Sequence, residues 1–126
     1  MAHFILEYST NLDQTDESIH QLFTALHQVA EQTGVFPMKG LRGRAYPCGQ
    51  YRMADGNPEH GFAHLTVKLG AGRSMQDRES AAKEFFAIMS EHFAEQVNKK
   101  GVMLSFEMKE LEAVLKFNQN NVPDYL

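Results

Sequence analysis

Apolar and polar residues alternate along parts of this chain in a way that predicts β-strands. The clearest alternation lies in 62–69, where every second residue from Ala63 to Leu69 is aliphatic, and the segment 102–109 follows the same pattern. The short apolar and aromatic segment 4–8 predicts a mostly buried strand. A further strand is predicted at 39–46, because Pro37 disfavours a helix just before it.

Two other segments carry apolar residues at helical spacing. The segment 16–33 is predicted to be a helix that starts at Thr15 or Asp16 and ends at Gly34. A second helix is predicted over 75–98, where Ser74 and Asp77 resemble a capping box. The buried face of the first helix is predicted to be Ile19, Leu22, Phe23, Leu26 and Ala30, and that of the second Ala82, Phe85, Phe86, Met89, Phe93 and Val97.

The predicted elements follow the order strand, helix, strand, and this order occurs twice. The two halves also share a short similarity, since 2–6 lines up with 63–67. We therefore expect an α+β fold in one domain over 1–126, with pseudo-repeat halves of about 1–58 and 59–126. Each half predicts a right-handed crossover between parallel strands, giving a four-stranded mixed sheet with two helices on one face.

The second face of such a sheet has no predicted cover. A large bare apolar face is unusual on a monomer, and association of several copies would cover it. The segment 47–58 contains the turn signature of residues 53–57, and the tail 116–126 has little regular pattern. We therefore expect an oligomer whose tail is irregular.

Composition narrows the class of protein. The chain has 126 residues and a formal net charge of -4, which argues against general nucleic-acid binding. Its longest apolar run, 85–89, is far too short for a membrane span, and Glu7 interrupts the only apolar stretch that a secretory signal would need. Because the single cysteine, Cys48, cannot form an internal disulfide, a cytoplasmic location is expected.

All five arginines lie between positions 42 and 78, although the chain is acidic overall. Arg42 and Arg44 are two apart on a predicted strand and face the same way, so they repel each other unless an anion lies between them. Arg73 stands between a strand end and a helix start. Because the guanidinium group binds carboxylates through two parallel hydrogen bonds, these three arginines predict a carboxylate site. The alternative is that they form ion pairs with acidic residues far away in the sequence.

Three weaker candidates remain. His60 and His64, with Glu59, lack a convincing third metal ligand, so no metal is expected. Cys48 has no activating base nearby in the sequence. Glu110 and Glu112 are more typical of a solvated strand edge than of a carboxylate pair.

Six stretches, taken in order, resemble the 5-carboxymethyl-2-hydroxymuconate isomerase family of the tautomerase superfamily. The likeness covers essentially the whole chain, and the order of the stretches is more specific than any one of them. They are Thr33 to Pro37 (TGVFP), Gly40 to Arg44 (GLRGR), Met53 to Gly56 (MADG), Leu69 to Ser74 (LGAGRS), Leu104 to Glu107 (LSFE) and Phe117 to Val122 (FNQNNV).

The resemblance implies a doubled β-α-β fold, a homotrimer, and a site at the start of the first strand near a subunit boundary. It implies a cofactor-independent isomerase that moves a proton on a small unsaturated carboxylate during the degradation of aromatic compounds. In that family an amino-terminal proline carries the proton after Met1 is removed. Arginines matching Arg42 and Arg73 bind and stabilise the substrate, with Arg44 secondary.

The chain departs from this pattern at the catalytic position, where Ala2 stands in place of proline. An exposed α-amine at Ala2 titrates near neutral pH, and burial and nearby arginines lower its pKa further, so it can act as a base once Met1 is removed. The prediction is therefore an isomerase in which the amine of Ala2 moves the proton and Arg42, Arg44 and Arg73 bind the substrate. The alternative is a catalytically weak or silent protein of the same fold that binds an anionic metabolite.

Overall fold

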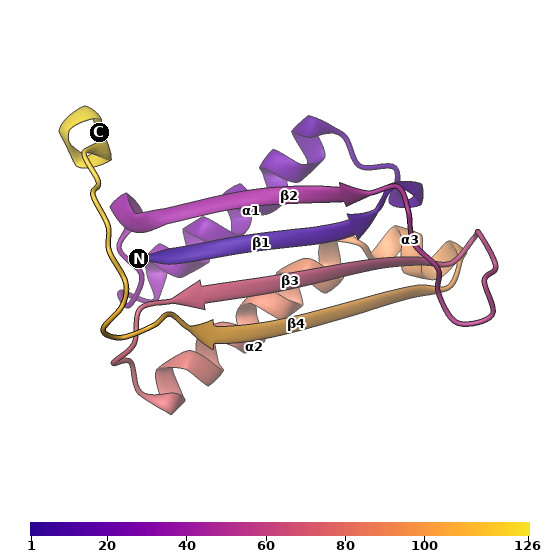
Figure 1. The fold of residues 1–126 in the computed structure, drawn as a ribbon. Coiled ribbons are helices and arrows are strands. Elements are labelled where there is room, and N and C mark those ends of the chain that lie inside the picture. Colours follow the sequence, from indigo (N-terminus) through magenta and orange to yellow (C-terminus); the bar gives the residue numbers. More distant parts are fainter.

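The computed structural model describes residues 1–126 as one sheet covered by helices on one side (Figure 1). Three 3-10 turns complete it, at Thr10–Leu12, Met38–Gly40 and Val122–Tyr125. No helix is long and apolar enough to cross a membrane. The elements are β1 (Ala2–Ser9), α1 (Asp16–Gln32), β2 (Leu41–Cys48), β3 (Gly61–Leu69), α2 (Met75–His92), α3 (Ala94–Lys99) and β4 (Val102–Glu110).

The four strands form a mixed sheet in the order β2-β1-β3-β4. The strands β1 and β2 run parallel, as do β3 and β4, and the two halves meet where β1 and β3 pair antiparallel. The predicted α+β fold, with a doubled strand-helix-strand unit, is therefore confirmed. This arrangement brings the starts of β1 and β2 and the ends of β3 and β4 to one edge of the sheet.

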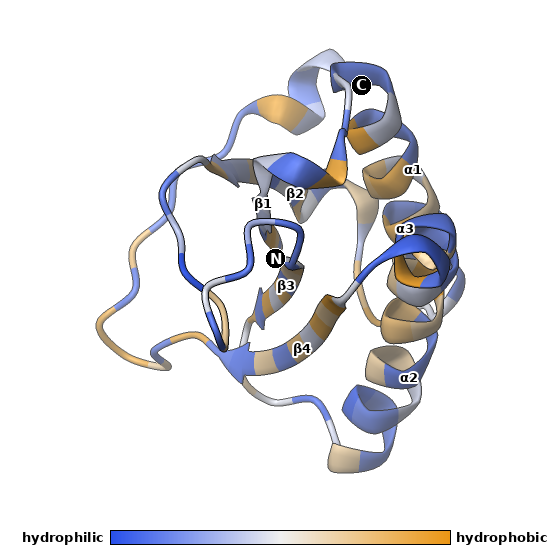
Figure 2. Cartoon of the chain, turned by 90° about the vertical axis from the view of Figure 1, so that its right-hand side faces the viewer, coloured by the Kyte–Doolittle hydropathy of each residue, from blue (hydrophilic) through white to orange (hydrophobic).

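The helices form a single layer against one face of the sheet (Figure 2). Alternate residues of the two central strands point into this layer, among them Phe4, Leu6, Leu65 and Val67, all with 0% exposure. Phe85 of α2 packs edge-on against Phe4 and Phe36, which locks the second helix onto the centre of the sheet.

The structure corrects the predicted second helix. Phe93 has φ -98° and ψ 9°, so the helix stops at His92 and a short helix follows it. The buried residues include Ala81, whereas Phe86 is 39% and Val97 43% exposed. The apolar spacing over 75–98 does not reveal the break at Phe93. Phe93 is buried, so it fits the spacing of a continuous helix.

The ends of the helices follow the sequence signals more closely. Thr15 caps α1, and its hydroxyl accepts a hydrogen bond from the backbone N–H of Ser18. Ser74 caps α2 by accepting from the N–H of Asp77. Gly34 has φ +71°, the left-handed backbone that favours glycine after a helix.

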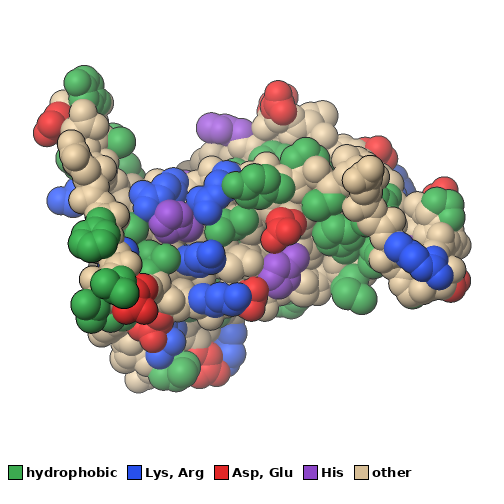
Figure 3. All heavy atoms as spheres, viewed as in Figure 1, with side chains coloured by type: hydrophobic (Ala, Val, Ile, Leu, Met, Phe, Trp, Pro, Cys, Tyr) green, Lys and Arg blue, Asp and Glu red, His purple; other side chains and the backbone are tan.

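The uncovered face of the sheet mixes charged and apolar side chains, which corrects the large apolar face expected from the sequence. Figure 3 views this face and shows lysine, arginine, histidine and acidic side chains across it. Alternate strand residues supply them, including His3, Arg42 and Arg44 near the start of β1 and His64 and Glu107 farther along. Tyr46 of β2 and Met103 of β4 lie on the same face and are 52% and 63% exposed, so part of this face is apolar.

Candidate active site

A cavity of about 630 Å³ lies at the edge of the sheet where β1 and β2 begin. The tail after β4 returns to this edge and forms one wall, close to the amino terminus (Figure 1). The lining residues are Met1, Pro37, Lys39, Gly40, Arg42, Phe117, Asn118, Gln119, Asn120 and Pro123.

Met1 fits this cavity because Gly40 has no side chain. A Cβ atom at residue 40 would lie 3.1 Å from the Met1 Cα atom and 3.3 Å from its amino nitrogen. The Met1 carbonyl also accepts a hydrogen bond of 3.2 Å from the N–H of Gly70. Met1 is thus held in the cavity, while Ala2 behind it is fully buried in β1.

Arg73 joins two connections that approach the same edge. Its Nε and Nη2 atoms donate to the carbonyl of Val35 at 2.9 and 2.7 Å, and Nη1 donates to that of Gly70 at 2.8 Å. The guanidinium also lies 5.0 Å from the ring centre of Phe36. A guanidinium has five N–H groups, so two remain to bind a ligand.

Arg42 and Arg44 face the same side of β2, as predicted, and His3 contacts both of them. Arg42 Nη2 is 2.7 Å from His3 Nε2, and Arg44 Nη1 is 3.2 Å from His3 Nδ1. Burial lowers the pKa of His3, and the charges of Arg42, Arg44, Lys68 and the amino terminus lower it further. A neutral imidazole accepts at only one nitrogen, so these arginines keep N–H groups free for an anion.

The ion pairs of this chain leave the three predicted arginines without acidic partners. Arg42, Arg44 and Arg73 have no carboxylate oxygen within 4.0 Å, so distant ion pairs do not explain them. The arginine cluster of the sequence is not a single cluster in space. Arg78 pairs with Glu110 at 3.6 Å, and Arg52 lies beside Gly56 in the loop before β3.

Charge around the amino terminus acts directly on its amine. Burial lowers the pKa of the Met1 amine below its ordinary value of 8.0, and the positive charges of Arg73, Lys116 and Arg42 lower it further. Each factor disfavours the ammonium form. The Met1 amine at this edge of the sheet therefore loses its proton at a lower pH than a solvated amine does. The cations beside it have no acidic side chains as partners.

We expect this shift to be measurable as the pH dependence of amine acylation. The neutral amine is the reactive form, so the midpoint of the acylation rate should lie below pH 8.0 in the Met1-containing protein. Arg42→Met should raise the midpoint, because one nearby positive charge is lost. Arg44→Met is the matched control, since Arg44 does not contribute to the shift. A wild-type midpoint at or above 8.0, or equal midpoints in both variants, would contradict this electrostatic account.

The weaker sequence candidates do not come together as sites. His60 contacts Asp55 at 2.9 Å, whereas His64 contacts Ser105 at 2.6 Å and Glu107 at 3.3 Å. No three metal-ligating side chains gather anywhere in the chain.

The two acidic candidates are also separate. Glu110 accepts from the N–H of Gly72 and pairs with Arg78, while Glu112 lies beyond the strand and accepts from the N–H of Val114. The thiol of Cys48 lies 3.6 Å from the carbonyl oxygen of Tyr46, with no base beside it.

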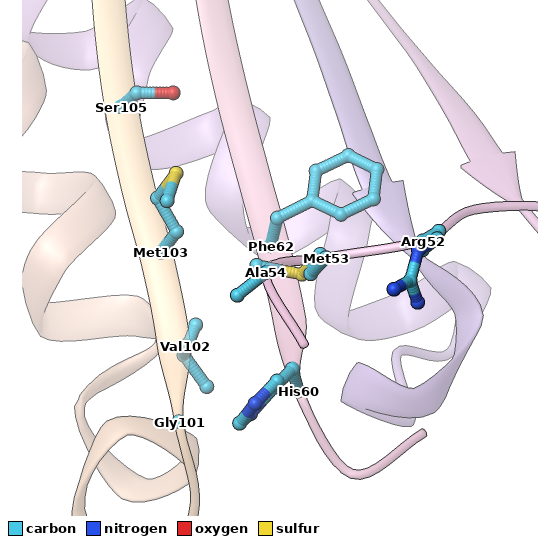
Figure 4. Close-up of a pocket in the computed structure, with 9 residues that line it drawn as sticks. All are labelled: Arg52, Met53, Ala54, His60, Phe62, Gly101, Val102, Met103 and Ser105. Atoms are coloured by element: carbon cyan, nitrogen blue, oxygen red, sulfur yellow. The ribbon is translucent and has the colours of Figure 1, made fainter. Parts of the chain in front are cut away.

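A second hollow of about 510 Å³ lies at the opposite end of the sheet (Figure 4). Its side chains come from the starts of β3 and β4 and from the loop before β3, and include Met53, Phe62, Val102 and Met103. Arg52 is the only arginine among its lining residues. It has this single arginine and no amine, whereas the first cavity lies beside the amino terminus, so we place the candidate active site at the amino-terminal edge.

Sequence reasoning missed three members of this edge. His3 is an ordinary polar residue in a strand until the register with Arg42 is known. Lys116 lies in a tail without pattern, and the position of Met1 depends on the absence of a side chain at Gly40. The motif that contains Gly40 was the only sequence signal pointing to any of them.

Comparisons with known proteins point to one family. The family model for 5-carboxymethyl-2-hydroxymuconate isomerase matches residues 2–126. The chain is 38% identical over 122 residues to 5-carboxymethyl-2-hydroxymuconate Delta-isomerase of Escherichia coli, covering 97% of this chain and 96% of that protein.

Solved structures also resemble the fold, and two of them show how closely. A 5-carboxymethyl-2-hydroxymuconate isomerase from Deinococcus radiodurans R1 superimposes with a TM-score of 0.90 at 34% identity, covering 99% of this chain and 94% of that one. A symmetric trimer of fused 4-OT has a TM-score of 0.65 at 15% identity, covering 94% and 92%, which shows a common fold only.

The doubled β-α-β sheet, with an amine and unpaired arginines at one edge, defines a protein of the tautomerase class. Within that class, the family model and the relatives that align over nearly the whole chain all point to one family. The chain belongs to the 5-carboxymethyl-2-hydroxymuconate isomerase family.

Proposed function

We propose that this protein is a 5-carboxymethyl-2-hydroxymuconate delta-isomerase whose base is the α-amine of Ala2 after removal of Met1. The observation that carries this proposal is the set of cations without acidic partners, Arg42 and Arg73, beside the amino terminus of β1. Family membership supports the reaction class, and the geometry supports this choice of residues.

The reaction is a proton transfer that leaves the atomic composition of the substrate unchanged. The neutral amine takes the proton from the enol hydroxyl group, which gives a dienolate and an ammonium group. The same ammonium returns the proton to a carbon of the dienolate, which gives the isomeric keto acid and restores the amine. No oxidant, metal or cofactor enters this balance.

The arginines act on the charge that moves during this transfer. Negative charge spreads over the dienolate and carbonyl oxygens, and fixed donors aimed at that charge lower the barrier. Arg73 suits this role because its guanidinium is already held by the carbonyls of Val35 and Gly70. Arg42 binds a carboxylate group, and Arg44 supports it through His3.

Removal of Met1 is central to the proposal, because Met1 now fills part of the cavity. Its loss would place the new amine of Ala2 at the start of β1, facing the space that Met1 leaves. The second candidate function is anion binding without catalysis, and the observation that favours it is Ala2, which offers an amine without the ring of proline.

The proposal also covers the oligomeric state of the enzyme, its cellular location and the kind of pathway it serves. We propose that the protein is a homotrimer. The symmetric trimer of fused 4-OT supports this proposal, because its fold is similar. The tail carries large exposed apolar residues, including Leu115 and Phe117 at 76% and 90% exposure, which an assembled protein would shield. The single cysteine supports a cytoplasmic location, and the reaction belongs to the degradation of aromatic compounds.

The test is an isomerase assay on two forms of the protein whose intact masses differ by Met1. Isomerisation of 5-carboxymethyl-2-hydroxymuconate is followed by ultraviolet absorbance. The form without Met1 should turn over substrate, and the form with Met1 should be at least about tenfold slower, because its amine lies one residue too far out. No rate above buffer in the processed form would overturn catalysis and leave the anion-binding function.

A further inference from the structure

Lys116 is the one half-buried residue between 112 and 126, where all the others are exposed. Its neighbours in the tail, Phe117 and Asn118, line the cavity at the amino-terminal edge. The tail therefore turns Lys116 inward while it presents its large apolar residues to solvent.

The ammonium of Lys116 lies beside the guanidinium of Arg73. A methyl group placed on Gly70 would be 3.8 Å from Lys116 Nζ and 3.6 Å from Arg73 Nη1. Both cations therefore lie within a few ångströms of the same point. Gly70 also bonds the Met1 carbonyl, so this point adjoins the amino terminus.

No acidic side chain compensates this group of charges. Lys116, like Arg42 and Arg73, has no carboxylate oxygen within 4.0 Å. The positive charge of Lys116 also reaches the Met1 amine, where it is the second largest charge effect after that of Arg73. Like charges held together at the edge of a cavity are costly unless an anion joins them.

We propose that Lys116 binds the third carboxylate of the substrate and makes the site selective for tricarboxylates over dicarboxylates. This inference rests on the proposed function, which supplies the substrate. Muconate has two carboxylates, and the carboxymethyl group adds a third. Arg42, Arg73 and Lys116 then offset the three carboxylates with three positive charges.

The structure favours Lys116 for the group that distinguishes the substrates. Arg42 and Arg73 are fixed by hydrogen bonds to the folded body, so they suit the part of the substrate where the proton moves. Lys116 is carried by the tail and has a flexible side chain, which suits a carboxylate on a branch of the substrate.

The experiment compares Lys116→Met with Lys116→Arg on two substrates. Lys116→Met should raise KM for 5-carboxymethyl-2-hydroxymuconate roughly 10- to 100-fold, because one charge-assisted hydrogen bond is lost. Its KM for 2-hydroxymuconate, which lacks the carboxymethyl group, should change by less than about twofold. Lys116→Arg should retain most of the selectivity. Lys83→Met, at a position 76% exposed on α2, is the control for loss of one positive charge.

Binding without turnover separates this inference from the proposed function. Calorimetry with tricarballylate and glutarate compares two unreactive acids that differ by one carboxylate. Wild type should prefer tricarballylate, and Lys116→Met should lose that preference, whether or not the protein isomerises anything. Equal losses for both acids, or a preference that survives in Lys116→Met, would overturn the role of Lys116 even if isomerase activity is present. Thermal unfolding of each variant confirms that the fold is kept.

Discussion

Replacing Ala2 by proline, in protein that has lost Met1, should raise kcat by about tenfold or more. The amine of an amino-terminal alanine rotates freely about the bond between its nitrogen and Cα, whereas the ring of proline fixes the nitrogen. An amine that is held in one direction spends more of its time aligned with the substrate. The proline ring has room in the part of the cavity that Met1 fills, because Gly40 has no side chain there.

The measurement is kcat by ultraviolet absorbance, with intact mass taken on every sample. Acetylating the amine of the Ala2→Pro protein is the matched control, because it keeps the ring and removes the base; the rate should fall to that of buffer. An unchanged kcat in the processed Ala2→Pro protein would mean that the base is not the missing element, and would favour anion binding as the function of the cavity.

Replacing Arg73 by methionine should lower kcat/KM roughly 100- to 1,000-fold, because one fixed donor to the developing charge is lost. It should also lower the free energy of unfolding by about 1–3 kcal/mol, because the carbonyls of Val35 and Gly70 lose their donors. Arg73→Lys should recover part of the kcat/KM through its charge. It cannot donate to both carbonyls and the ligand in the same fixed geometry.

Arg52→Met is the control for this prediction. Arg52 also has no acidic partner, but it lies in the loop before β3, beside the second hollow. Its replacement should leave kcat/KM unchanged, which separates a local effect of Arg73 from a general loss of positive charge. Denaturant unfolding of each variant gives the stability change. A value of kcat/KM in Arg73→Met within about twofold of wild type would contradict the role of Arg73.

The elements of the fold follow from patterns that each act over a few residues. Alternation along β3 and β4, and the spacing of Leu22, Leu26 and Ala30, are read directly from neighbouring positions. Capping by Thr15 is local for the same reason. The break at Phe93 was not predicted, because its buried ring also fits the spacing of a continuous helix. The break depends on what packs against the ring, which neighbouring positions do not show.

The site was predictable only in part. Two-residue spacing already placed Arg42 and Arg44 on one side of a strand. Their common contact was not predictable, because His3 meets them through the pairing of β1 with β2, and the register of that pairing depends on the whole sheet. The mixed character of the uncovered face was not predictable for the same reason, since no single strand shows which of its two faces is covered.

The sequence by itself determined the strands, the helices, the doubled order and the family, because these depend on residue type and short spacing. Only the tertiary structure decided that Arg73 is tied to Val35 and Gly70, that Lys116 turns inward from the tail, and that Met1 lies against Gly40. Those contacts join residues far apart in the chain, and their positions follow from the packing of the helices on the sheet.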